Sequence, residues 1–209
     1  MKSNIINKCN ACNFEKILTN KNYSFYTKGN YNLNIIGVRS NTDGNKVTNK
    51  FDDALVVIYS NKTRDNKKLV YSITTDPGSY SMKNFITRKG TAILVPGQYK
   101  GAYAIGKHKG KYTALCQVKP VKVYRDGNKD DVFDFDPATI EEGLFGINIH
   151  RSNETWIRTT VDGYSAGCQV FNYPQQFNSF MSICKRAASI WGNSFTYTLL
   201  EEKDLDELG

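Results

Sequence analysis

The residues best suited to nucleophilic catalysis in this chain are a histidine and a cysteine in neighbouring segments. The apolar stretch Gly146-Ile-Asn-Ile-His150 ends on one of only two histidines, and Cys168 follows the small residues Ser165-Ala-Gly. A thiol attacks as the thiolate, so it needs a base or a cation beside it. We therefore predict that His150 activates Cys168. The glycine before the cysteine would let backbone N–H groups approach a developing oxyanion.

These residues resemble the signature of the L,D-transpeptidase catalytic domain, a strand-borne His followed by Ser/Thr-His-Gly-Cys-x-Arg. His150 matches the strand histidine, and Ser165, Gly167 and Cys168 match three of the four residues that end at the nucleophile. Upstream, residues 95–106 look like the family's Pro-x-Gly-x-Tyr-x-Ile element with looser spacing. The resemblance spans roughly residues 33–200.

The sequence departs from that signature at two positions. Ala166 stands where the family has a second histidine, and Val170 stands where it has the arginine after the cysteine. With Gln169 in between, the motif Ser-x-Gly-Cys-Gln is similar to domains of phage and prophage proteins. Arg151 or Arg158 could replace the missing arginine at a substrate carboxylate, although loop arginines are more often simply solvated.

What the resemblance implies is acyl transfer on peptidoglycan stem peptides, with no metal or other cofactor. Cys168 would attack an amide carbonyl while His150 carries the proton, and N–H groups around Gly167 would hold the oxyanion. Release of the acyl group to water makes an L,D-peptidase, and release to an amine makes an L,D-transpeptidase. We expect release to water, and hence L,D-peptidase activity, rather than release to an amine. The family orients its histidine with a backbone carbonyl, and Asp162 is an alternative orienting group.

The predicted site residues fall into two groups. Predicted catalytic residues are Cys168, His150, Ser165 and Gly167. Predicted substrate contacts are Gln169, Arg151, His108 and Tyr103. His108 lies in the basic segment Gly-Lys-His-Lys-Gly, where it could line the cleft in place of the absent second histidine or be a solvated turn residue.

Other functions compete with this interpretation. A non-catalytic cell-wall-binding or virion structural module would retain the fold and lose motif residues, but retention of both Cys168 and His150 argues against it. Papain-like amidases and transglutaminases usually place the cysteine before the histidine, and here the order is reversed. A buried structural thiol is the remaining interpretation of Cys168, and it is the favoured one for Cys116 and Cys184.

Two other motifs could bind metals. Cys9-x-x-Cys12 is half of a zinc site without a matching half. Asp126-Gly-Asn128-Lys-Asp130 has the alternating oxygens of a calcium loop, but Pro137 stands where an EF-hand needs glutamate, and a solvated acidic hairpin is favoured.

The composition limits partners and location. A net charge of +8 suits a polyanion such as a cell wall, or it serves solubility, and no motif for specific nucleic-acid binding occurs. Apolar runs are too short to span a membrane. The N-terminus does not resemble a secretory signal, so we expect synthesis in the cytoplasm and action on the wall after release or within a virion, with virion proteins as candidate partners.

Turn residues separate short apolar segments throughout the chain, which predicts a mainly β sandwich or barrel. Expected strands are 33–38, 54–60, 68–74, 91–95, 102–105, 113–119, 121–124, 145–150 and 195–200. One helix is expected from Pro174 to Trp191, ended by Gly192. We divide the chain into an N-terminal extension (1–30) with faint helical periodicity, an L,D-transpeptidase-like domain (31–200) and an acidic tail (201–209).

Overall fold

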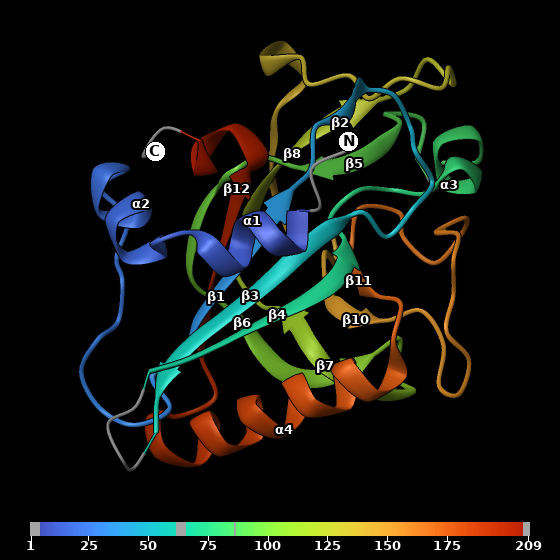
Figure 1. Ribbon diagram of the computed structural model, residues 1–209. Coiled ribbons are helices and arrows are strands. Elements are labelled where there is room, and N and C mark those ends of the chain that lie inside the picture. Colours follow the sequence, from blue (N-terminus) through green and yellow to red (C-terminus); the bar gives the residue numbers. More distant parts are fainter. Residues whose placement is uncertain (1–4, 62–65, 86, 207–209) are drawn as a thin grey trace.

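The computed structural model describes residues 5–61, 66–85 and 87–206, and it confirms the mainly β prediction (Figure 1). Eight strands close into a barrel in the order β1-β12-β6-β7-β10-β11-β4-β3. Their bounds are β1 Asn34–Arg39, β3 Asp53–Ser60, β4 Asn66–Thr74, β6 Gly97–His108, β7 Tyr112–Gln117, β10 Ile149–Arg151, β11 Gln169–Phe171 and β12 Phe195–Glu201. Only the pairs β1/β12 and β10/β11 are parallel.

A three-stranded antiparallel sheet, β5-β8-β9, lies beside the barrel. Its strands are β5 Thr91–Leu94, β8 Val121–Asp126 and β9 Glu141–Gly143, and the short strand β2 spans Thr42–Asn45. The helices are α1 Ile5–Ala11, α2 Phe14–Asn20, α3 Ser79–Lys83 and α4 Pro174–Trp191, with 3-10 turns at Pro137–Thr139 and Glu202–Leu205. No described helix is long and apolar enough to cross a membrane.

The longest helix, α4, has the predicted bounds. Pro174 occupies the first turn, and Gly192 ends the helix at φ +87°. Its apolar face, including Phe177, Phe180 and Cys184, is buried in the core that fills the barrel. Figure 1 shows α4 across one end of the barrel, with its first turn near β10 and β11.

The N-terminal residues pack against the outside of the barrel. In β1, Ile35 belongs to the interior core, whereas Ile36 belongs to a second core with Phe14 and Leu18. Alternate residues of a strand point to opposite faces, so α1 and α2 cover the outer face that β1 and β3 would otherwise expose. The described part of the acidic tail lies against these helices, where Asp204 pairs with Lys21 at 2.7 Å.

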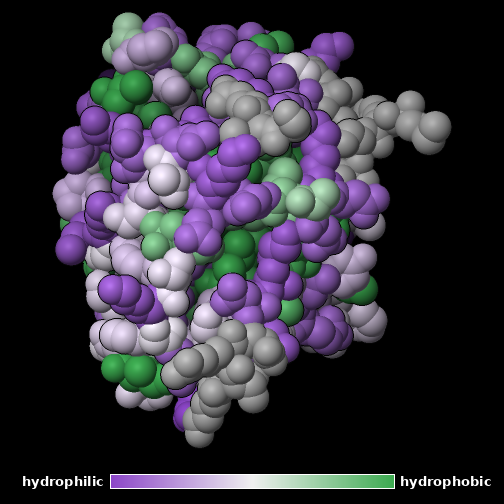
Figure 2. Space-filling model, turned by 60° about the vertical axis from the view of Figure 1, so that its left-hand side comes forward, coloured by the Kyte–Doolittle hydropathy of each residue, from purple (hydrophilic) through white to green (hydrophobic). Residues whose placement is uncertain are grey.

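The surface of this side of the molecule is mostly hydrophilic. Figure 2 shows hydrophilic side chains over most of the face that carries α2, and the hydrophobic ones form small separate patches.

One predicted strand is much shorter than expected. Residues 145–148 do not join a sheet, because the side-chain oxygen of Gln117 accepts the N–H groups of Phe145 and Ile147. Gly146 between them has φ +72°. The strand β10 therefore begins only at Ile149, and the turn that precedes it lies next to Cys168.

Candidate active site

His150 and Cys168 line the same cavity, which has a volume of about 620 Å³. One wall comes from the segment 144–148, which precedes β10, and the opposite wall comes from α3 and the segment that follows it. Gly163, Tyr164 and Ala166, in the loop between β10 and β11, also line it, and further lining residues come from the end of β6 and from β8. Several separate segments of the chain therefore enclose the predicted catalytic pair.

The parallel pair β10/β11 brings the histidine and the cysteine together. The register places Ile149 opposite Gln169 and His150 opposite Val170. The N–H of Gln169 donates to the carbonyl of Asn148 at 2.9 Å. Cys168 therefore lies at the level of Asn148, two residues before His150 along the neighbouring strand.

A backbone carbonyl orients His150, as the family resemblance implies. Nδ1 of His150 lies 2.9 Å from the carbonyl oxygen of Arg151. A carbonyl only accepts, so Nδ1 carries the proton and Nε2 is left as the nitrogen that can accept one. The hydroxyl of Tyr112 donates to the same carbonyl at 3.0 Å and lies 3.2 Å from Nδ1. Asp162 instead bonds Asn49 and Thr160, so it does not orient the histidine.

His108 stacks on His150 at the end of β6. Their ring centroids are 4.0 Å apart at an interplanar angle of 23°. His108 is buried rather than solvated, and its Nδ1 lies 3.0 Å from the side-chain amide of Asn148. The side-chain oxygen of that asparagine in turn accepts the N–H of Gln117. His108 therefore has a fixed position over the imidazole.

Burial favours the neutral forms of both predicted catalytic groups. Burial, and to a smaller extent the nearby His108, lower the pKa of His150 to about 3. Burial raises the pKa of Cys168 to about 11, against the smaller opposing effect of a hydrogen bond from the N–H of Asn148. The thiol lies 3.3 Å from the carbonyl of Gly146, an acceptor that only the protonated form can use. The resting pair is thus thiol and imidazole, and not a thiolate and an imidazolium.

The turn before Cys168 depends on Ser165 and Gly167. The Ser165 hydroxyl, fully buried, donates to the carbonyl of Cys168 at 2.8 Å and accepts the N–H of Gly167. Gly167 has φ +112°, and a Cβ there would lie 2.2 Å from the carbonyl oxygen of Ala92. The N–H of Gly167 is thus used inside the turn, whereas the N–H of Asn148 donates to the sulfur of Cys168 at 3.5 Å.

Three of the four predicted substrate contacts lie outside the cavity lining. Gln169 is fully buried, and its amide bonds Gly167 and the hydroxyl of Tyr197. Tyr103 is also fully buried, in the barrel core. Arg151 pairs with Glu154 at 2.9 Å. Only His108 lines the cavity.

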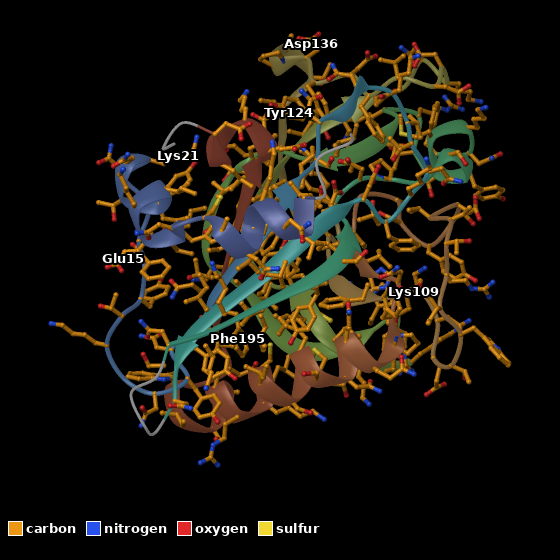
Figure 3. The ribbon with its side chains drawn as sticks, viewed as in Figure 1. Glu15, Lys21, Lys109, Tyr124, Asp136 and Phe195 are labelled. Carbon is orange, nitrogen blue, oxygen red and sulfur yellow. The ribbon has the colours of Figure 1, made fainter. Side chains whose placement is uncertain are left out.

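Arg158, the other candidate for carboxylate binding, also lies outside that lining, and its guanidinium lies over the ring of Tyr164. Two cationic residues that line the cavity, Lys109 and Arg125, were not predicted from the sequence. Lys109, labelled in Figure 3, is exposed in the turn after His108. Arg125 is held by Glu141 at 2.9 Å and by the ring of Phe145. The position of Lys109 beside His108 could have suggested its place, whereas β8 carries no signal for Arg125.

The two possible metal motifs are occupied by protein contacts. Cys9 is buried, and Cys12 donates to the carbonyl of Leu205. Asn128 bonds Asp130 and Asp134 within its own loop. Among the described residues, no group of three or more His, Cys, Asp and Glu side chains could hold a metal ion.

Comparison with known proteins adds no relative: no family model, curated protein or solved structure matches this chain.

Proposed function

We propose that this protein is a cysteine-dependent acyl-transfer enzyme that acts on peptidoglycan stem peptides. Within this proposal, L,D-peptidase activity is favoured over L,D-transpeptidase activity, in a phage-type protein that reaches the wall by release or within a virion. The observation that carries it is the constellation in the cavity, where Cys168 shares the lining with His150, whose imidazole is oriented by the Arg151 carbonyl. The resemblance of residues 146–171 to the L,D-transpeptidase signature supplies the substrate class.

The neutral resting pair sets the order of proton transfer in this proposal. As the sulfur attacks the amide carbonyl, the thiol proton moves to Nε2 of His150 and the Arg151 carbonyl holds the Nδ1 proton of the new imidazolium. The imidazolium then gives a proton to the leaving amine. Water attacks the thioester, with His150 as its base, and the free thiol returns. The N–H of Asn148 donates to the sulfur of Cys168, and in this proposal it stabilises the oxyanion that forms beside the sulfur.

Lys109 is the side chain best suited to a substrate carboxylate. It is exposed at the cavity, and among the described residues it takes part in no salt bridge. Arg125 also lines the cavity, but its charge is balanced by Glu141. This role for Lys109 takes the place of the motif arginine, which is Val170 here.

The decisive experiment is mass spectrometry of purified cell walls and soluble muropeptides after incubation with wild type, Cys168→Ala and Cys116→Ala. Cys116 is the matched control because it is another partly exposed thiol that does not line the cavity. Shortened stem peptides from wild type and Cys116→Ala, but not from Cys168→Ala, would support the peptidase. New crosslinks or exchanged terminal amino acids would support the transpeptidase instead.

A second candidate is a non-catalytic wall-binding or virion module. The observation in its favour is the raised pKa of Cys168, since most activated cysteines have a lowered pKa. Unchanged muropeptides over several stem chemistries, together with sedimentation of the protein with the walls, would favour this candidate and exclude the enzyme.

A further inference from the structure

A second hollow lies at the end of α4 that carries Trp191. It has a volume of about 420 Å³, and its described lining contains Lys100 and Lys119 but no Asp or Glu. A neighbouring hollow of about 480 Å³ shares the two lysines, but its lining also contains Glu142. We therefore call only the first hollow, which has no acidic residue in its described lining, the lysine groove.

The cations of the lysine groove are not neutralised by the protein. Lys100 and Lys119 are both exposed. In the part of the chain that the structure describes, neither of them takes part in a salt bridge. A Cβ on Gly101 would lie 3.1 Å from Nζ of Lys119, so the missing side chain leaves room for the ammonium group. The groove therefore presents uncompensated positive charge to a ligand.

An aromatic ring is held in place at the edge of this groove. Trp191 is 51% exposed, yet its indole N–H donates to the carbonyl of Asn30 at 2.9 Å. A Cβ on Gly29 would lie 2.3 Å from the indole ring, so that position must lack a side chain for the ring to pack there. An exposed aromatic group with a fixed orientation offers a flat apolar surface for a ligand.

The remaining groups favour a sugar chain over a nucleic acid. Single-stranded nucleic acids stack successive bases on successive rings. Here the ring of Tyr31 packs on Tyr59, with centroids 5.1 Å apart, and under Arg186. Tyr26 is only partly exposed, so Trp191 is the most exposed aromatic ring of the described lining. The groove lining also supplies amide and hydroxyl groups, which can bond sugar hydroxyls. These are Asn32, Ser194 and Thr196.

We propose that the lysine groove binds an acidic glycan, a sugar chain that carries carboxylates. One sugar stacks on Trp191, and the carboxylates lie near Lys100 and Lys119. This site is separate from the catalytic cavity, because α4 has 18 residues, hence a length of about 27 Å, and reaches from β11 to the groove. In Figure 3, Phe195, which lines the groove, and Lys109, which lines the cavity, lie on different sides of the view.

Tryptophan fluorescence tests the site directly. The full chain with Trp156→Phe leaves Trp191 as the single tryptophan, since the sequence has two. Titration with a galacturonic acid oligomer should change the emission of Trp191 with saturation. An uncharged N-acetylglucosamine oligomer of the same length should bind at least about tenfold more weakly, because it lacks the carboxylates. Adding Cys168→Ala should leave this binding unchanged, so the result does not depend on the proposed catalytic function.

Charge substitutions identify the groove as the binding site. Lys100→Gln with Lys119→Gln should weaken binding of the acidic oligomer at least about fivefold. Lys16→Gln with Lys111→Gln removes the same charge from exposed positions outside the groove and should change it less than about twofold. Equal weakening by both pairs would overturn the proposal, since binding would then follow net charge alone. Tighter binding of a deoxythymidine oligomer, or no saturable change in emission, would also overturn it.

Discussion

The reactivity of Cys168 with an alkylating reagent should report a neutral thiol and not an activated thiolate. Burial raises its pKa from the ordinary 9.0 to about 11. Each pKa unit lowers the thiolate fraction at neutral pH about tenfold, so Cys168 has about 100-fold less thiolate than an exposed cysteine. A more basic thiolate is also more nucleophilic, by about half of that factor on a logarithmic scale. Alkylation of Cys168 at pH 7 should therefore be about tenfold slower than that of a cysteine in an unstructured peptide.

The assay is iodoacetamide labelling followed by peptide mass spectrometry, which separates Cys168 from the other four cysteines. The rate constant should rise about tenfold per pH unit from pH 6 to 9.5, without a plateau. His150→Gln should change it little at pH 7, because a neutral imidazole does not stabilise a thiolate. A plateau with a midpoint below pH 8, lost in His150→Gln, would refute the reasoning and restore an ion pair of the two residues.

Three further predictions follow from the geometry of the site. Gly167→Ala should destabilise the protein by roughly 3 kcal/mol or more in urea unfolding, because it combines a positive φ with a clash against the Ala92 carbonyl. Gly146→Ala, with φ +72° and open space around the Cβ, should cost only about 1–2 kcal/mol, and equal costs would contradict the role of the contact. The folded-state pKa of His150 is about 3 against 6.5, so the unfolded chain binds more protons between these values and stability falls as pH drops below 6.5. Between pH 7.5 and pH 5.0, wild type should lose about 2 kcal/mol more unfolding free energy than His150→Gln does. Equal losses in the two proteins would exclude the lowered pKa of His150. Tyr112→Phe removes a hydrogen bond to the Arg151 carbonyl. It should lower kcat/KM on stem peptides about fivefold and shift the imidazole ¹⁵N resonances of His150. A loss of stability with unchanged resonances would mean that Tyr112 has only a packing role.

The sequence predicted those helices and strands whose ends and faces are set by residues close to them in the chain. The bounds of α4 follow from Pro174, Gly192 and the apolar repeat between them, because helix ends and helix faces are set within a few residues. The strand expected at 145–150 failed because its N–H groups bond a glutamine side chain from β7, a partner distant in sequence. β11 was missed because it has only three residues, directly after the Cys168 turn.

In the candidate site, too, only the features that are set by nearby residues were predicted from the sequence. The association of His150 with Cys168 was predicted from the motif, and the structure places both in the lining of one cavity. Whether a polar residue of the motif faces the cavity or the core could not be predicted. Gln169 lies one residue from the thiol, but its buried amide bonds Tyr197 of β12 and Thr75, which directly follows β4. Arg125 likewise lines the cavity from β8 of the three-stranded sheet, whose position beside the barrel no local spacing in the sequence predicts.

The cavity lies next to β10/β11, one of the two parallel strand pairs in the mainly antiparallel barrel. Antiparallel neighbours can be joined by tight turns, but the parallel pair β10/β11 needs a long crossover. Here the crossover is the irregular segment between Arg151 and Gln169, and its residues 163–166 form part of the cavity lining. The same parallel register sets Cys168 at the level of Asn148, two residues before His150. The parallel pairing of β10 and β11 therefore positions the two reactive groups, and the crossover that it requires supplies the loop that encloses them. Substitutions in this loop should consequently alter substrate selection more readily than they alter the stability of the barrel.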